Sequence, residues 1–278
     1  GGGVMDISVV VITKNEEKNI KECLLSIRNQ KFSSGSYEII LVDAHSTDNT
    51  IRLAEQYTDK IILSEPGMPV QRNLGIKESN GKYILLLDAD MRISEGLIED
   101  CFKRMEEKSE LVGLYIEEYI LGKTFFHKIR RFERSFYSGT VIDCVRFVRS
   151  DTISQIGGYD ETILIGEDWD LDRRFNIVGR TELTKTPLYH DEKTLSLRKY
   201  IQKKSYYPTV MDAYLDKWGK NDPIIKKQFG AYYRLLGIFV ENGNWKKLLF
   251  NPNLTFGLFI IRFIVAIRYT ALMIFISK

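Results

Sequence analysis

Hydrophobic residues form short unbroken runs in the first two thirds of the chain, and segments with hydrophobic residues at every third or fourth position separate them. Ile7–Ile12 and Tyr37–Val42 are runs rich in β-branched residues, as is typical of strands buried on both faces of a sheet. Ile20, Leu24 and Ile27 follow the first run at helical spacing. Strands that alternate with helices predict βαβ units and a parallel, doubly wound sheet.

The same reading extends to the other segments before the C-terminal tail. The residues from about 125 to 137 are basic and aromatic and receive no element, whereas the tail from about Ser196 onwards reads as helices. Further strands are expected at Lys60–Leu63, Tyr83–Leu87, Leu111–Tyr119, Val141–Val148 and Thr181–Tyr189, and helices from Ser46 to about Tyr57 and at Val70–Ser79, Glu95–Lys108 and Asp168–Val178.

Polar side chains follow the predicted strands at their carboxyl ends. Thr13 to Glu16 follow the first strand, Asp43 follows the second, and Asp88 and Asp90 follow the fourth. Ligands of open α/β sheets bind outside the carboxyl ends of the strands, so these side chains mark a candidate ligand site. A dehydrogenase or a P-loop enzyme is not indicated, because the chain contains neither GxGxxG nor GxxxxGK[ST].

Asp88 and Asp90 end an apolar run with one alanine between them. On an extended backbone the two carboxylates point to the same side and repel unless a cation joins them. Mg²⁺ and Mn²⁺ suit such oxygen ligands and connect one or two carboxylates to substrate phosphates. A solvated turn and a metal site both explain this motif when it is considered alone.

Three further features carry candidate chemistry. Glu167 and Asp168 stand before a predicted helix, where they either interact with the helix dipole or supply a general base. Arg72 has the planar donor fork that suits phosphate, although an exposed helix Arg is the simpler reading. His190 follows a predicted strand and is either a structural residue or a ligand that completes a Mn²⁺ shell.

Charge is distributed unevenly over the 278 residues. Residues 198–278 contain 14 Lys/Arg and 4 Asp/Glu, a net of +10, whereas the remainder carries 26 basic and 33 acidic residues, a net of −7. An acidic body with a basic tail predicts that the tail meets an anionic partner, unless the charges form a solvated helical face. The three cysteines are widely spaced, which suggests neither a disulfide framework nor a structural zinc site.

The tail also contains Leu254–Ile276, an apolar stretch long enough to span a bilayer. Arg262 and Arg268 lie inside it, and each costs roughly 2.5–3.5 kcal/mol at the centre of a spanning helix. A helix in the membrane interface or a shallow re-entrant pair therefore fits better than a single span, and a buried helix that covers the α/β domain is the alternative.

The motifs together resemble family 2 glycosyltransferases of the GT-A fold over about residues 5–195. One departure is Asp43-Ala44-His45-Ser46, where members of the family often have Asp-Asp-Gly-Ser. The QxxRW motif of processive synthases is absent near the tail, which favours the addition of one sugar over polymer synthesis. The matching segments are TKNEEKNI, LVDAHSTDNT, QRNLG, LLLDADM and GGYDETILIGEDWDLDRRF, in this order.

The resemblance implies a role for each matching position. Asp168, with Glu167 beside it, would be the catalytic base of an inverting transfer. Asp90 would be the principal metal ligand, with Asp88 and His190 as further candidates. The nucleotide-binding residues would be Thr13, Asn15, Glu16, Asp43, Arg72 and Asp88, and Arg173 or Arg174 would help bind phosphate.

The sequence thus predicts an α/β protein with a GT-A catalytic domain at residues 5–195 and a basic, hydrophobic helical extension at 196–278; residues 1–4 are read as a cloning remnant. The expected activity is a Mn²⁺- or Mg²⁺-dependent inverting transfer from a UDP- or GDP-linked sugar to a hydroxyl or phosphate of a lipid-linked acceptor. The expected place is the cytosolic face of the cell membrane, as a peripheral or monotopic protein without a nucleic-acid partner. A nucleotidyltransferase of similar fold and a catalytically silent membrane scaffold or nucleic-acid binder are the alternatives.

Overall fold

A computed structural model describes residues 5–58 and 60–276, so the expected cloning remnant lies outside the described residues. The chain divides into two compact units. The first unit consists of Gly1–Tyr119 and Asp143–Asp191, and the second of Ile120–Ile142 and Glu192–Lys278. The C-terminal extension therefore begins close to the expected boundary, but it also takes in a segment from the middle of the chain.

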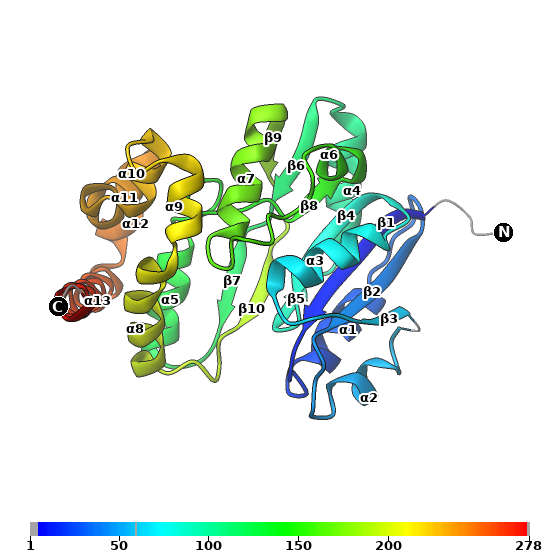
Figure 1. Cartoon of the computed structure of the whole chain (residues 1–278), viewed down its shortest axis with the longest axis horizontal. Coiled ribbons are helices and arrows are strands. Elements are labelled where there is room, and N and C mark those ends of the chain that lie inside the picture. Colours follow the sequence, from blue (N-terminus) through cyan, green and yellow to red (C-terminus); the bar gives the residue numbers. More distant parts are fainter. Residues whose placement is uncertain (1–4, 59, 277–278) are drawn as a thin grey trace. The chain divides into compact units, whose positions relative to one another are not determined.

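The first unit is built on a seven-stranded sheet with the order β3-β2-β1-β4-β8-β6-β9 (Figure 1). Neighbouring strands are parallel except at β8, which runs antiparallel to both β4 and β6. The predicted mostly parallel sheet is therefore confirmed. The strands are β1 (Met5–Thr13), β2 (Tyr37–Asp43), β3 (Lys60–Leu63), β4 (Gly81–Asp88), β6 (Leu111–Tyr115), β8 (Phe147–Arg149) and β9 (Arg180–Leu183).

The central strand β1 shows why this sequence forms a three-layered structure. Val9 and Val11 pack into the hydrophobic core on one face of the sheet, while Val10 and Ile12 pack into the core on the other face. Because successive side chains of a strand point to opposite faces, an unbroken apolar run is required here. The first core also contains residues of helices α1 (Ile20–Arg28), α2 (Thr50–Ala54) and α4 (Leu97–Glu107). The second core contains residues of α3 (Met68–Lys77), α6 (Ser150–Gln155) and α7 (Glu167–Val178).

Two of the predicted strands are each divided between two sheets. The segment Leu111–Tyr119 forms β6 in the large sheet and the start of β7 (Glu118–Leu121) in a small sheet of order β5-β10-β7. The segment Thr181–Tyr189 likewise contributes to β9 and then to β10 (Leu188–Asp191) of the small sheet, with Pro187, which has no backbone N–H, between them. The third strand of the small sheet is β5 (Met91–Ile93).

Two other expectations differ from the structure. Val141–Val148 was expected to be a strand throughout, but only its last two residues belong to β8, and residues 141–146 are irregular. The basic, aromatic segment that received no element forms α5 (Phe125–Arg134), which begins where the Thr124 hydroxyl accepts a hydrogen bond from the His127 N–H. A side-chain cap of this kind satisfies one of the free N–H groups at a helix start.

The second unit is helical. Its last helix, α13, contains a stretch at Pro252–Met273 that is long and apolar enough to cross a bilayer, and only 17% of it is buried within the structure. A core helix of a soluble protein would be mostly buried, whereas α13 leaves most of this apolar stretch exposed. Besides α5, the helices are α8 (Leu197–Tyr206), α9 (Asp212–Trp218), α10 (Pro223–Phe229), α11 (Ile238–Val240), α12 (Trp245–Phe250) and α13 (Pro252–Ile276), with the helical turns η1 (Tyr207–Val210), η2 (Tyr233–Gly237) and η3 (Glu241–Gly243).

Candidate functional site

The carboxyl ends of β1, β2 and β4 lie side by side at one edge of the large sheet. Thr13 at the end of β1 pairs with Asp43 at the end of β2, and Ile12 pairs with Asp88 at the end of β4. Parallel pairing thus gathers polar side chains that are far apart in the sequence, as the sequence predicted. The hydroxyl of Thr13 is buried and has no hydrogen-bond partner among the described residues, so it is available to a ligand.

The loop after β2 is held by Asp43. Its carboxylate is fully buried and accepts hydrogen bonds from the Ser46 backbone N–H at 2.7 Å and from the Ser46 hydroxyl at 2.5 Å. Ser46 also accepts a hydrogen bond from the Asn15 N–H at 2.7 Å, so the loops after β1 and β2 support each other. Asn15 adopts a positive φ of 54°, a conformation that Asn tolerates better than most residues. Direct contact between Asp43 and a nucleotide stays a prediction.

Glu16 lies in the loop after β1, and the charges of Asp88 and Asp90 affect its pKa. Burial raises the pKa of its carboxyl, a hydrogen bond from Asn19 lowers it, and the negative charges of Asp90, Asp48 and Asp88 raise it again. The net direction is upward, because a partly buried carboxylate near other carboxylates is less stable in its charged form. Glu16 is therefore part of the acidic site.

Three consecutive side chains of α3 tie the site together. Gln71 donates hydrogen bonds from Nε2 to the carbonyl groups of Thr13 at 2.9 Å and Val42 at 3.0 Å, which joins the ends of β1 and β2. Asn73 donates to the Tyr159 carbonyl at 2.9 Å and accepts from the Tyr159 N–H at 2.7 Å. Arg72, between them, points to the carboxylates.

Arg72 is the centre of a buried ion-pair network. Its Nη1 lies 3.0 Å from Glu167 Oε1 and 3.0 Å from Asp168 Oδ1, and its Nη2 lies 3.0 Å from Asp88 Oδ1. The guanidinium also lies over the ring of Tyr159, 5.1 Å from its centroid. Only 4% of the Arg72 side chain is exposed, so these charges are paired where water reaches them poorly. The predicted nucleotide-binding Arg72 thus joins the end of β4 to the start of α7.

The network gives its carboxylates different properties. Burial and the neighbouring Asp168 raise the pKa of Glu167 to about 7, although Arg72 opposes this. Burial also acts to raise the pKa of Asp88, but Arg72 and Arg146 outweigh it and hold the pKa below its ordinary value. Asp168 is more exposed than Glu167, with 28% of its side chain accessible against 5%.

Asp168 has one free oxygen. Its Oδ1 accepts from Arg72 and, at 3.3 Å, from the Tyr159 hydroxyl, whereas no hydrogen bond to Oδ2 is found within residues 5–58 and 60–276. A carboxylate that is held through one oxygen and open at the other is suited to accept a proton from a substrate.

Asp90 begins a second chain of contacts. Its Oδ2 lies 3.1 Å from His190 Nε2, and His190 Nδ1 lies 3.5 Å from Glu118 Oε2. Arg146 in turn donates to Glu118 Oε1 at 2.6 and 3.0 Å. Burial alone would lower the pKa of His190, but the contacts with Asp90 and Glu118 raise it to about 10, so the ring is protonated at neutral pH.

Of the three predicted metal ligands, Asp90, Asp88 and His190, Asp90 is the best placed to bind a divalent cation. Asp90 Oδ1 is buried and, among the described residues, has no hydrogen-bond partner, so one ligand oxygen is ready. Asp88 is engaged by Arg72, and His190 must lose its proton before it can coordinate a metal. The described part of the chain contains no group of three or more His, Cys, Asp or Glu that would hold a metal alone. Remaining ligands would have to come from substrate phosphates and water, as is common for Mg²⁺.

Arg173 and Arg174, the two residues of α7 that were predicted to bind phosphate, have different surroundings. Arg174 donates to Asp170 Oδ2 at 2.9 Å and to the carbonyl groups of Ile156 at 2.8 Å and Gly158 at 2.6 Å. Its guanidinium is thus used to hold the turn before Tyr159. Arg173 is 8% exposed on the same helix.

Three residues of the site were not identified from the sequence: Glu118, Arg146 and Tyr159. Each lies in or beside a segment whose strand structure was misjudged or that reads as a plain turn. The sequence offered one indication of Glu118 and Arg146, because both are charged residues inside predicted apolar strands. Charged residues are rarely buried unless they are paired, so two such residues suggest a buried ion pair.

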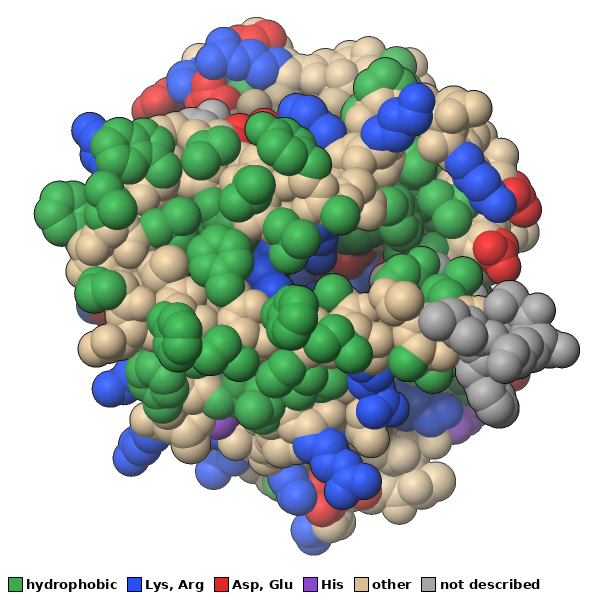
Figure 2. Space-filling model, turned by 90° about the vertical axis from the view of Figure 1, so that its left-hand side faces the viewer, with side chains coloured by type: hydrophobic (Ala, Val, Ile, Leu, Met, Phe, Trp, Pro, Cys, Tyr) green, Lys and Arg blue, Asp and Glu red, His purple; other side chains and the backbone are tan. Residues whose placement is uncertain are grey.

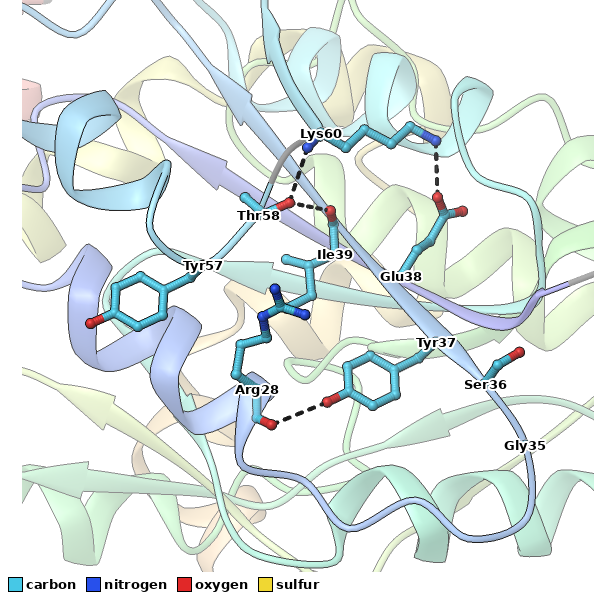
Figure 3. Close-up of a pocket in the computed structure, with 9 residues that line it drawn as sticks. All are labelled: Arg28, Gly35, Ser36, Tyr37, Glu38, Ile39, Tyr57, Thr58 and Lys60. Atoms are coloured by element: carbon cyan, nitrogen blue, oxygen red, sulfur yellow. Dashed lines mark hydrogen bonds and ion pairs between the residues drawn. The ribbon is translucent and has the colours of Figure 1, made fainter. Parts of the chain in front are cut away.

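Two open cavities of the first unit lie outside this network. One, of about 510 Å³, lies at the amino ends of β2 and β3, at the opposite edge of the sheet from Asp43 (Figure 3). Some of its polar groups already have partners, since Lys60 pairs with Glu38 at 3.0 Å and the Tyr37 hydroxyl donates to the Arg28 carbonyl at 3.4 Å. The other, of about 430 Å³, is lined by His45 and by residues of α3. Neither cavity contains the paired aspartates.

Comparison with known proteins points to one family. Residues 8–165, more than half of the chain, match the family described as glycosyl transferase family 2. Poly(ribitol-phosphate) beta-N-acetylglucosaminyltransferase TarS of Staphylococcus aureus is 34% identical over 113 residues, which are 37% of this chain and 19% of TarS. Glycosyltransferase AglE of Haloferax volcanii is 27% identical over 188 residues, 62% of this chain and 62% of AglE. The matched segments thus span less than two thirds of these relatives.

Solved structures show the same fold. S. aureus TarS in complex with UDP matches with a TM-score of 0.59 at 20% identity, covering 88% of this chain and 78% of that one. Mannosyltransferase PcManGT from Pyrobaculum calidifontis in complex with GDP-Man and Mn²⁺ matches with a TM-score of 0.61 at 16% identity, covering 96% and 87%. These neighbours have the GT-A fold, so the predicted fold class is confirmed.

Proposed function

The chain belongs to glycosyl transferase family 2 and is a glycosyltransferase, and we propose that it moves one sugar from a UDP- or GDP-linked donor to a hydroxyl or phosphate of a lipid-linked acceptor, with inversion at the anomeric carbon. The bound UDP and GDP-Man of the structural neighbours support a nucleotide-sugar donor. The exposed apolar helix α13 supports an acceptor at the cytosolic membrane face.

The observation that carries the proposal is the link made by Arg72. One guanidinium contacts Asp168, which has an oxygen free for a proton, and Asp88, which stands beside the candidate metal ligand Asp90. A base for the acceptor and an acidic site for the donor diphosphate are thereby held in one network. Inverting transfer requires both, because the acceptor attacks as the diphosphate departs.

In this proposal each residue of the network has a separate task. Asp168 accepts the acceptor proton at Oδ2, while Arg72 and Tyr159 fix Oδ1 and so orient the carboxylate. Glu167 is almost fully buried and contacts Arg72, so it is less accessible to an acceptor than Asp168 and supports Arg72 instead. Asp90, with help from Asp88, would hold the divalent cation. When bound, such an ion neutralises charge on a departing diphosphate.

Replacement of Asp168 by Asn tests the assignment. General-base help is typically worth about 10²–10⁴-fold, so D168N is expected to lower kcat by that factor. Affinity for the nucleoside diphosphate should stay unchanged, because Asn keeps the size and the Oδ1 acceptor. Turnover would be followed as release of nucleoside diphosphate from a panel of UDP- and GDP-sugars.

The matched control is Glu167→Gln, which removes the neighbouring carboxylate but leaves Asp168 in place. Its kcat should fall much less than that of D168N. Near-wild-type turnover in D168N would remove Asp168 from the role of base. Release of inorganic diphosphate instead of a nucleoside diphosphate would identify a nucleotidyltransferase and overturn the proposed reaction.

A further inference from the structure

The second unit encloses a charged cluster that takes no part in the site described above. Arg130 on α5 pairs with Glu192 at 2.8 and 3.0 Å and also contacts Glu133. Arg262 on α13 donates to Glu133 Oε1 at 2.9 and 3.1 Å and to the Tyr137 hydroxyl at 2.7 Å. These two arginines and two glutamates balance each other in charge.

Two further cations of the same unit have no carboxylate within hydrogen-bond or ion-pair distance among the described residues. Lys204 on α8 contacts the Tyr200 ring at 5.9 Å, and Arg234 in η2 contacts the Tyr137 ring at 5.9 Å. Within the described residues, neither Lys204 Nζ nor the Arg234 guanidinium forms a hydrogen bond or an ion pair. Burial, together with the positive charges of Arg130 and Arg234, lowers the pKa of Lys204 to about 7, although the negative charge of Glu133 opposes this. When Lys204 is protonated, its charge and that of Arg234 exceed the charge of the two glutamates, which Arg130 and Arg262 already balance.

Apolar surface surrounds this charge. Figure 2 shows a face on which hydrophobic side chains form a broad band and border a hollow with basic and acidic side chains at its floor. α13 packs against α5 and α8, the two helices that carry Arg130 and Lys204. Its exposed apolar side chains include Phe256, Ile260, Phe263, Ile264 and Ile267.

We propose that the cluster binds the phosphomonoester head group of a lipid, with Lys204 and Arg234 as its new partners and the hydrocarbon chain against the exposed side chains of α13. A phosphomonoester carries about −1.5 to −2 charges at neutral pH, which matches Arg234 together with protonated Lys204, and a bound anion would favour that protonated form. A phosphodiester lipid carries a single charge and leaves one cation unpaired. An exposed apolar helix beside an unpaired cationic site is suited to a ligand that is both anionic and apolar.

This inference rests on the membrane association in the proposed function and goes further by naming the head group. The test compares binding of the whole protein to phosphatidylcholine vesicles that contain phosphatidic acid, a phosphomonoester, or phosphatidylglycerol, a phosphodiester. The two vesicle types are adjusted to equal surface charge, so electrostatic adsorption alone gives equal affinities. The expected result is about tenfold tighter binding to phosphatidic acid, the gain of at least one charge-assisted hydrogen bond.

The double variant K204M/R234M should lose this preference. It is expected to fold, because both side chains are only partly buried and neither forms a hydrogen bond or an ion pair among the described residues, and its Tm would be measured. The matched control K220M/K226M removes two exposed lysines of the same unit and should keep the preference. Nucleoside diphosphate binding is measured in all variants, so failure at the donor site is distinguished from failure here.

Three results would overturn the inference. Equal affinity of the wild type for the two vesicle types shows charge attraction only. An undiminished preference in K204M/R234M places the head group elsewhere. Abolition of vesicle binding by millimolar inorganic phosphate shows a site for free phosphate rather than for a lipid.

Discussion

Replacement of Arg72 by Met removes the one cation shared by Glu167, Asp168 and Asp88 and keeps a side chain of similar length. Glu167 is almost fully buried, so its charge would be left without compensation. Removal of one partner from a buried ion pair typically costs about 3–5 kcal/mol of unfolding free energy. Asp168 and Asp88 are each 28% exposed and regain water more easily, which places the expected loss at about 3 kcal/mol at pH 8.

The loss should depend on pH. The folded-state pKa of Glu167 is raised to about 7, so its contribution to stability decreases as pH rises from its ordinary value through 7. Without Arg72 this pKa rises further, and the penalty in the variant is largest at high pH. At pH 5.5 Glu167 is protonated in both proteins, and the difference should shrink by about 1–2 kcal/mol, since one pKa unit is worth about 1.4 kcal/mol.

Urea unfolding at pH 8 and pH 5.5, followed by tryptophan fluorescence, measures both quantities. Arg52→Met, at an exposed position of α2, is the matched control and should change stability by less than about 0.5 kcal/mol. A loss below about 1 kcal/mol for R72M, or an equal loss at both pH values, would show that the network does not hold these carboxylates in the way described.

Three other predictions follow from single side chains. Asp90→Asn should abolish any effect of Mn²⁺ on nucleoside diphosphate affinity in titration calorimetry; an unchanged metal effect would move the ligand elsewhere. Gly158→Ala should destabilise the protein by more than Gly157→Ala in urea unfolding, although both have positive φ, because a Cβ on Gly158 would meet Asn73 Oδ1 at 2.6 Å and one on Gly157 meets nothing within 4 Å. Burial raises the pKa of Asp172 to about 7, so Asp172→Asn should raise stability at pH 8 and not at pH 4; equal effects would show that its charge is not the cause.

The local pattern of the sequence was sufficient for the first four strands of the large sheet, although it missed β5 and made α2 too long. β1, β2 and β4 lie where unbroken apolar runs predicted them, and α7 begins within a residue of its predicted start. These elements are decided by periodicity, because a strand buried on both faces admits few polar residues. The polar residues at the strand ends, such as Asp43 and Asp88, could also be identified from the sequence, because each directly follows an apolar run.

The segments after α4 depended on contacts that local pattern does not encode. The segments 111–119 and 181–189 look like single strands, but each changes from the large sheet to the small one. The choice of pairing partner depends on neighbouring strands, not on the apolar character of the segment itself. The residues 120–142 belong with the C-terminal unit for a similar reason, since α5 packs on α13 and forms its ion pairs there.

The sequence by itself determined the α/β class, the acidic strand ends and the presence of an apolar, basic tail, because composition and periodicity act over a few neighbouring residues. Only the tertiary structure decided that Arg72 bridges Asp88 and Asp168, which lie 16 and 96 positions away along the chain. It also showed that, among the described residues, Lys204 and Arg234 form no direct ion pair. The energy of a charge depends on which groups packing brings within a few ångströms and on how much water remains, and neither quantity is set by neighbours in sequence.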